Sequence, residues 1–508
     1  MRWTVWLAAL AVPFSYGTTA ILARTSPETI GVYGLLTVYI GLVTAFLYLG
    51  GDSVVIRFVP GLGVNERLSF LASYFVIVLA TLTPLVALAV LWPEKLHYLF
   101  GKGQNAKFHA VILCMAPIHI IFSMVVAALN GMLDIRWAQA LMRAVTVGSF
   151  AIYAVLFFFW RSLLATHYTW MIWAVYLGLA ALGAVVGGWR LLKPNRGRLS
   201  SLRFFLPRGF WSYALSTQQV GVVWFFIERI DYILVLNLGG LHTLGQYVAI
   251  ATIAKTIPVI NNFFLGALLP SLTSLIPSQN RTAASEVFSV HTRILLVVNA
   301  MTTCGLMLLA TPLTAILGEK YSSLRFLLVL MVFLVGVASP GAVGATLLSS
   351  VGKQQRSVWV GLLQIGLFVL LFVNLWPRWG LLGAVLANGI SMVISYVILL
   401  AVARRAAPVD PSVFKSYTIF AFVAVLAAVF STVVKPATVG TGLAAWMVAI
   451  ALFLTLARYR FTECMELLKW FVPDLPAARS KLVRPDAAFV SSSNMSSERN
   501  TYVASDVS

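Results

Sequence analysis

The stretch GLLGAVLANGISMVISYVILLAV, residues 380–402, contains no charged residue and decides the fold class. As an α-helix rising about 1.5 Å per residue, it is long enough to cross a hydrocarbon core of about 30 Å. Similar apolar runs occupy residues 3–23 and 70–92, and short polar connections separate runs of this kind along most of the chain. The sequence therefore predicts an all-α polytopic membrane protein with about 14 transmembrane helices.

The composition agrees with a membrane protein. Of the 508 residues, 60% are hydrophobic and 10% are charged, whereas soluble domains carry about 25% charged residues. The formal net charge of +20 is explained by the enrichment of Lys and Arg in the cytoplasmic loops of membrane proteins. These cations are spread thinly and form no basic face on a soluble module, so nucleic acid is not an expected partner.

The sequence contains no motif of a catalytic or metal site. Cys114, Cys304 and Cys464 are isolated from one another, with no spacing that favours a disulfide framework or a metal site. The nucleophile-elbow, zinc-protease and Walker lysine motifs are also absent. We therefore expect no enzyme, no catalytic residues, no metal and no cofactor.

The predicted helices are separated by connections mostly under about 20 residues, too short for an inserted extramembrane domain. They lie near 3–23, 31–50, 69–93, 108–129, 138–160, 168–190, 209–237, 244–270, 293–317, 325–350, 357–376, 380–403, 414–434 and 440–457. We expect a six-helix lobe at 1–200, a second six-helix lobe at 201–405, two additional transmembrane helices at 406–457, and a cytoplasmic, partly disordered tail at 458–508.

An internal repeat supports the two lobes. Gly31-Val-Tyr33 recurs as Gly245-Gln-Tyr247, and the arginines that end the sixth and twelfth helices, Arg190 and Arg404, have about the same separation. Pro60 matches Pro270 at a similar offset. A repeat of six helices inserts both halves with one orientation, as in secondary transporters whose substrate path lies between the halves. The excess of Lys and Arg in the loop at 193–208 favours a cytoplasmic location for both termini, with Lys95, Lys102 and Lys107 as the main exception.

Lys255 is the foremost candidate for function. It lies roughly 16 Å into the eighth predicted helix, where a lysine costs on the order of 3 kcal/mol. We expect it to face a wet cavity or a partner, and Pro258 to kink its helix. The alternative is a structural ion pair with Glu228 or Asp231 on the preceding helix, and the two interpretations are compatible.

Other charged residues within or near the spans have competing interpretations. Glu228, Arg229 and Asp231 form either a buried network or part of a site, since residues three apart share a helix face. Snorkelling to headgroups explains charged residues at or just inside helix ends without invoking a site. This second group comprises Arg24, Asp52, Arg57 and Arg143. Asn388 lies beside a stripe of small residues and is a weaker candidate for a polar lumen.

Several stretches resemble the Wzx-type polysaccharide flippases of the multidrug/oligosaccharidyl-lipid/polysaccharide exporter superfamily. They are RTSPETIGVYG from Arg24, IRFVP ending at Pro60, RIDYILVL from Arg229, LGQYVA from Leu244, LPSL from Leu269 and GLLGAVLAN from Gly380. The resemblance covers roughly residues 1–457.

This resemblance implies a V-shaped bundle of two lobes around a cationic cavity in the bacterial inner membrane. Such proteins move undecaprenyl-diphosphate-linked saccharides between leaflets by alternating access. Candidate cations for the diphosphate are Lys255, Arg24, Arg57, Arg143 and Arg229; candidates for ion pairing or coupling are Glu228, Asp231 and Asp52. The implied partners are the lipid-linked saccharide and membrane lipids. A polysaccharide polymerase and export machinery are further partners compatible with the resemblance.

Two alternatives remain open from the sequence. A cation-coupled small-molecule or drug antiporter of the same superfamily would need buried carboxylates, and Asp52 is the only near case in the first half. A membrane glycan polymerase or ligase would need a sizeable external loop and a catalytic cluster, and the sequence shows neither.

Overall fold

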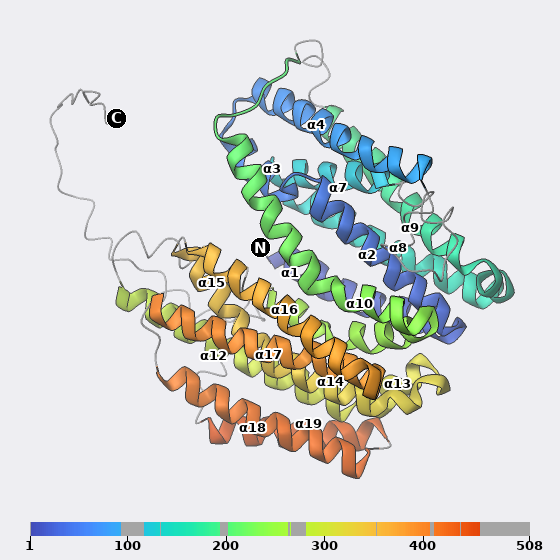
Figure 1. Cartoon of the computed structure of the whole chain (residues 1–508), viewed down its shortest axis with the longest axis vertical. Helices are drawn as coiled ribbons and strands as arrows, with labels where there is room; N and C mark the ends of the chain where they lie inside the picture. The colour runs from blue at the N-terminus through green and yellow to red at the C-terminus, as the bar shows by residue number, and fades with distance from the viewer. Residues whose placement is uncertain are drawn as a thin grey trace. The chain divides into compact units, whose positions relative to one another are not determined.

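The computed structural model describes residues 2–92, 116–132, 134–193, 202–262, 265, 281–351, 353–406, 411–436 and 438–457 (Figure 1). Within these ranges the regular structure is helical and no strand occurs, which confirms the all-α prediction. Several predicted features lie outside the described residues: Lys95, Lys102, Lys107, Cys114, Pro270, Cys464 and the tail at 458–508.

The predicted helices of the first half are all present. They are α1 (Arg2–Thr25), α2 (Pro27–Leu47), α4 (Val64–Leu91), α7 (Ala116–Gly131), α8 (Ile135–Phe159) and α9 (Arg161–Leu192). The short helix α3 (Gly51–Phe58) and the 3-10 turn η1 (Val59–Gly61) were not predicted. Gly50 and Gly51 both have positive φ angles, which glycine adopts readily. The chain therefore breaks after α2 and starts α3 in a new direction.

The second half has more interruptions than its sequence predicts. The predicted helices 209–237 and 244–270 are joined in α10 (Phe210–Ala254), which is broken at Gly240 by φ 74° and ψ −179°. The predicted helix 293–317 divides into α12 (Arg281–Leu308) and α13 (Ala310–Leu317), followed by η4 (Glu319–Leu324). The predicted helix 325–350 divides into α14 (Arg325–Ala338) and α15 (Ala342–Ser350) at the turn η5 (Ser339–Gly341), which contains Pro340.

The remaining helices match their predicted ranges. They are α16 (Gln354–Trp379), α17 (Leu381–Ala406), α18 (Pro411–Val434) and α19 (Val439–Leu456). Among the described residues, ten helices are long and apolar enough to cross a membrane by length and composition, and Ala116–Gly131 is a shorter apolar helix. Large apolar side chains such as Phe158 and Phe159, each 76% exposed, cover the outside of helices. The chain is a multi-pass membrane protein.

Helices α2 and α10 form the most extensive contact between the two halves (Figure 1). A Cβ atom on Gly31 would lie 2.6 Å from the carbonyl oxygen of Leu241, and one on Gly245 would overlap the carbonyl oxygen of Pro27. Leu241 follows Pro27 by 214 positions, as Gly245 follows Gly31. Each half therefore contributes the same two positions to one reciprocal contact, as in a two-fold interface. We call this contact the glycine seam.

Polar side chains attach the last two helices to the second half. Ser431 Oγ on α18 donates to the carbonyl oxygen of Met307 at 2.7 Å, and Arg325 Nε donates to Thr311 Oγ1 at 2.8 Å while its guanidinium also bonds Ser431. Trp446 Nε1 on α19 donates to the carbonyl oxygen of Met301 at 2.8 Å. Interhelical bonds of this kind stabilise helix packing within a membrane.

The glycine seam leads to a prediction about stability. Gly245→Ala should lower the melting temperature of the purified protein by several degrees, because the new methyl group overlaps backbone that cannot rotate away. Gly366→Ala on α16 is the matched control, since no atom lies within 4 Å of its added Cβ. The control should leave stability unchanged or raise it slightly. Equal melting temperatures for the two variants would contradict the close approach.

Candidate transport site

Lys255 lies at a break in the helical path. Helix α10 ends at Ala254, Lys255 forms a turn, and the chain is helical again at residues 256–262. Pro258 has no N–H group, so it cannot donate to the carbonyl of Ala254 and it favours this break. The sequence predicted a kink near Pro258, and the structure has an interruption three residues before it.

The side chain of Lys255 folds back onto the first part of α10. Its Nζ atom donates to the carbonyl oxygen of Glu228 at 3.0 Å and lies 3.8 Å from Asp231 Oδ2. It also lies 4.4 Å from the centre of the Tyr232 ring, within the range of a cation–π interaction. The Lys255 side chain is 31% exposed. The Lys255 side chain is thus held by protein groups at its end and remains partly exposed.

Asp231 is the buried centre of this network. Tyr247 Oη donates to Asp231 Oδ2 at 2.9 Å, and Asn388 Nδ2 donates to the same oxygen at 3.1 Å. The backbone N–H of Tyr232 donates to Oδ1 at 2.9 Å. A buried carboxylate is costly unless it is paired and hydrogen-bonded, and Asp231 has both kinds of partner.

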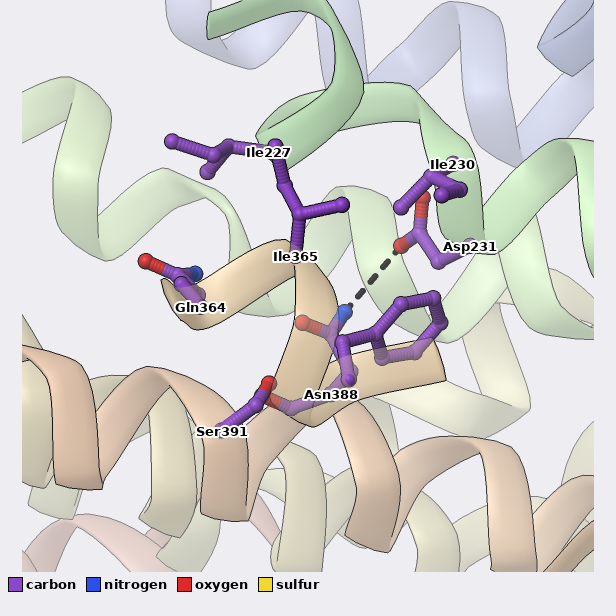
Figure 2. A pocket seen from close by; sticks show the side chains of 8 residues that line it. Ile227, Ile230, Asp231, Gln364, Ile365, Asn388 and Ser391 are labelled. Carbon is purple, nitrogen blue, oxygen red and sulfur yellow. Dashed lines mark hydrogen bonds between the residues drawn. The ribbon is translucent and has the colours of Figure 1, made fainter. Parts of the chain in front are cut away.

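A small pocket adjoins Asp231. Figure 2 shows Asn388 from α17 directed at Asp231, with Ser391 one turn further along the same helix. The pocket is lined by Ile227, Ile230, Asp231, Gln364, Ile365, Phe368, Asn388 and Ser391. It therefore combines one carboxylate and three neutral polar side chains with an apolar wall, around a free space about the size of one water molecule.

Arg229 faces the first half of the chain. Its guanidinium lies 5.5 Å from the centre of the Tyr232 ring, and a Cβ atom on Gly41 of α2 would lie 3.7 Å from Arg229 Cγ. Lys255 and Arg229 therefore share the aromatic ring of Tyr232 as a contact. The carbonyl of Glu228 accepts from Lys255, while the Glu228 residue is exposed.

The other predicted cations do not join this cluster. Arg24 Nε donates to the carbonyl oxygen of Ile316 at 2.9 Å, so it links the end of α1 to α13. Arg57 lies on α3, beyond the other end of α2, with its guanidinium 4.3 Å from the centre of the Tyr213 ring. Arg143 on α8 has a buried Nε atom without a hydrogen-bond partner among the described residues. Asp52 on α3 accepts a hydrogen bond from Tyr48 Oη at 3.1 Å.

Sequence reasoning missed two donors of this network and one wall of its pocket. Tyr232, Tyr247 and Gln364 were not among the candidates, and Asn388 ranked low. Tyr247 belongs to the repeated Gly-x-Tyr motif, and a tyrosine in a span needs a hydrogen-bond partner for its hydroxyl. This need for a hydrogen-bond partner could have identified Tyr247 as a candidate from the sequence.

Comparison with known proteins identifies the fold. No protein-family model matches the chain, and no curated protein matches it. The lipid II flippase MurJ in an inward closed conformation gives a TM-score of 0.64 at 14% sequence identity, over 92% of this chain and 99% of that chain. An inward-facing multidrug resistance transporter of the MATE family also gives a TM-score of 0.64 at 14% identity, over 78% of this chain and 94% of that chain. A MATE structure in complex with MaL6 gives 0.58 at 13% identity, over 80% and 95%.

The chain has the fold of the MOP-superfamily transporters. Among these structural neighbours are a lipid II flippase and a multidrug resistance transporter. At such identities the likeness establishes the fold, so the substrate has to be inferred from this chain's own residues.

The Asp231 network leads to a prediction with a neighbouring control. Asp231→Asn should lower the free energy of unfolding by about 1–3 kcal/mol, because Lys255, Tyr247 and Asn388 lose the charge that they surround. Glu228→Gln should change it little, because Lys255 contacts the backbone carbonyl of that residue. Thermal melting of both purified variants measures the difference. Equal melting temperatures would show that Asp231 is not the centre of the network.

Proposed function

We propose that this protein is a flippase that moves an undecaprenyl-diphosphate-linked oligosaccharide across the bacterial inner membrane, for the export of exopolysaccharide, capsule or O-antigen. The match to the MurJ structure supports the proposal because MurJ is a flippase of lipid II. That match also covers 92% of this chain, compared with 78% and 80% for the two MATE structures. The resemblance of the sequence to Wzx-type flippases points in the same direction.

The observation that carries the proposal is the pair of cations around Tyr232. Arg229 precedes the break of α10 at Gly240, and Lys255 follows it. Both cations nevertheless approach the ring of Tyr232. A diphosphate carries several negative oxygens, and charge-assisted hydrogen bonds from Lys and Arg are its usual ligands. In a low-dielectric interior, such attraction is much stronger than in water. The partly exposed side chain of Lys255 is therefore a suitable first contact for the substrate.

Asp231 gives this site a means of coupling to a cation. While Lys255 pairs with Asp231, the carboxylate charge is balanced. A diphosphate that draws Lys255 away leaves Asp231 buried with neutral donors alone, namely Tyr247, Asn388 and the Tyr232 N–H. A buried carboxylate without a charged partner favours the binding of a small cation. Substrate binding and cation binding are thereby linked through one lysine.

The other assignments complete the proposal. Both termini lie in the cytoplasm, residues 1–200 and 201–405 move as two lobes, and Arg24, Arg57 and Arg143 add positive charge along the substrate path. Glu228 and Asp52 are secondary candidates for coupling. Membrane lipids surround the protein, and a polysaccharide polymerase and export machinery are the partners that such a substrate requires.

A cation-coupled antiporter of small molecules is the second candidate function. Asp231 favours it, because a buried carboxylate beside a small pocket can exchange a cationic substrate for an ion. The two functions differ in the charge of the substrate. A flippase for a diphosphate needs Lys255 positively charged, whereas an antiporter for cations gains substrate attraction when Lys255 is removed.

An export assay on variants of Lys255 tests the proposal. Lys255→Ala should reduce polysaccharide export by at least about 10-fold, because one charge-assisted contact of about 1.5–3 kcal/mol is lost. Lys255→Arg should keep part of it, because the positive charge remains. The amount of each variant in the membrane is measured alongside, since a folding defect would also reduce export.

A double variant separates substrate binding from charge balance. If Lys255 only neutralises Asp231, then Lys255→Ala combined with Asp231→Ala should restore export. If Lys255 binds the diphosphate, the double variant should remain inactive at normal protein levels. Full export by Lys255→Ala alone would remove this lysine from the mechanism and contradict the proposal.

A further inference from the structure

The chain that enters α10 is attached to α4 by two serine hydroxyls (Figure 1). The backbone N–H of Arg203 donates to Ser69 Oγ at 3.3 Å, and that of Phe205 donates to Ser73 Oγ at 2.8 Å. Two residues of extended chain span about 6.6 Å, and four residues of helix rise about 6 Å. The spacing of the two donors therefore matches that of the two hydroxyls. We call residues 202–209 the strap.

The strap lies at the depth of a membrane interface. The apolar span of α4 begins at Glu66, and the two buried serines, Ser69 and Ser73, come shortly after it. At 1.5 Å per residue, their positions are roughly 5 and 10 Å inside the start of the span. Backbone that is not helical is costly at such a depth unless its polar groups have partners. The serine hydroxyls supply those partners, so the strap can lie at the boundary between headgroups and acyl chains.

Apolar side chains of the strap and of the start of α10 are exposed. Phe204 is 70% exposed, and Leu202 is also exposed. The chain turns at Gly209, which has φ 77°, and α10 then begins with the buried Phe210 and with Trp211, which is 50% exposed. Segments on a membrane surface bury such side chains about 5–10 Å into the boundary of headgroups and acyl chains. Since exposure of this apolar surface to water is costly, these side chains indicate contact with lipid.

Two arginines give the strap its charge. Arg203 and Arg208 are exposed, and neither has an ion-pair partner within the part of the chain that the structure describes. Arg67 on α4 differs, because its guanidinium donates to two backbone carbonyl oxygens of the turn before that helix. The acid Glu66 accepts a hydrogen bond from the N–H of Gly63 at 3.1 Å. The strap thus presents two cations beside apolar side chains.

We propose that the strap binds the headgroup of an anionic phospholipid. Arg203 and Arg208 contact the phosphate, and Phe204 and Trp211 lie beside the acyl chains. Arginine forms charge-assisted and often bidentate hydrogen bonds with phosphate oxygens. A zwitterionic headgroup also has a phosphate, but its own ammonium group balances that charge, so the two arginines favour a lipid with net negative charge. The inference concerns a lipid site on the surface of the chain and is independent of the transported substrate.

A fluorophore one turn beyond Trp211 reports which lipid lies there. Leu215 is 50% exposed and shares a face of α10 with Trp211. In a chain with Cys114, Cys304 and Cys464 replaced by Ala, Leu215→Cys carries a nitrobenzoxadiazole group. The purified protein is placed in bilayers with the same composition in both leaflets, so that its orientation does not matter. Phosphatidylglycerol or phosphatidylcholine with a nitroxide on an acyl chain quenches the fluorophore, and the two quenching curves give the relative affinity.

The strap predicts a preference for the anionic lipid at this probe. One arginine near an anionic surface strengthens the attraction by about five-fold. Phosphatidylglycerol should therefore be preferred over phosphatidylcholine by at least that factor. Arg203→Gln combined with Arg208→Gln should bring the ratio of affinities close to one. Salt at about 0.5 M should lower the ratio for the parent, because the ions screen the attraction between exposed charges.

Two controls separate the strap from the net charge of the protein. Lys353→Gln combined with Arg356→Gln removes two exposed positive charges near the start of α16, and it should leave the ratio unchanged. In the parent, the same fluorophore on Val425→Cys, an exposed position within the apolar helix α18, should give a ratio close to one. Melting temperatures of all variants show whether they fold.

Three results would overturn the proposal. The first is a parent protein that shows no preference for phosphatidylglycerol at the α10 probe. The second is a folded double variant of the strap that keeps the preference. The third is an equal preference at the α18 probe, or an equal loss in the α16 control, because either would show an effect of overall charge rather than of the strap.

Discussion

The close contact between α2 and α10 is the constraint on which the rest of the arrangement depends. Only glycine at positions 31 and 245 lets the backbone of each helix approach the other half, since a Cβ atom at either position meets a carbonyl oxygen. This approach fixes α10 against the first half, and α10 carries Arg229, Asp231 and the residues that lead to Lys255. The repeat of the sequence thus sets the position of the candidate site as well as the packing of the fold.

Charge balance explains the form of the site. Asp231 is 2% exposed and would be costly in an apolar bundle without its partners. Three neutral donors, the Tyr232 N–H, Tyr247 and Asn388, and one ammonium group satisfy it, and they come from α10, α17 and the turn at Lys255. Because the side chain of the charged partner, Lys255, is partly exposed, another anion could reach the lysine and take the place of the carboxylate.

The sequence predicted much of the fold because apolar length alone identifies a span, as at 380–402. It also predicted the repeat, from motifs such as Gly31-Val-Tyr33 and Gly245-Gln-Tyr247. It did not predict that these glycines face each other's helix, since a separation of 214 positions carries no information on contact. For Lys255, the sequence left Glu228 and Asp231 as alternative partners. In the structure, Lys255 contacts the backbone carbonyl of Glu228 and the carboxylate of Asp231.

The remaining differences also have physical reasons. An acidic residue in the first turn of a helix, such as Glu28 in α2, commonly complements the helix dipole. The sequence therefore did not distinguish Glu28 from an ordinary capping acid, and it did not point to its contact with His242. Arg24 matched the pattern of a snorkelling arginine, yet it bonds the carbonyl of Ile316. Tyr247 and Asn388 lie on helices whose approach to Asp231 depends on the packing of the second half, which local patterns do not specify.

Reconstituted translocation tests the central claim most directly. The purified protein is placed in vesicles with a fluorescent undecaprenyl-diphosphate-linked saccharide, and a membrane-impermeant quencher or lectin reports its movement between leaflets. We expect translocation that depends on the diphosphate and that stops when the lipid carries the same saccharide on a neutral linker. Vesicles that leave the diphosphate lipid in its original leaflet, yet exchange a cationic small molecule for an ion, would contradict the account and favour the antiporter.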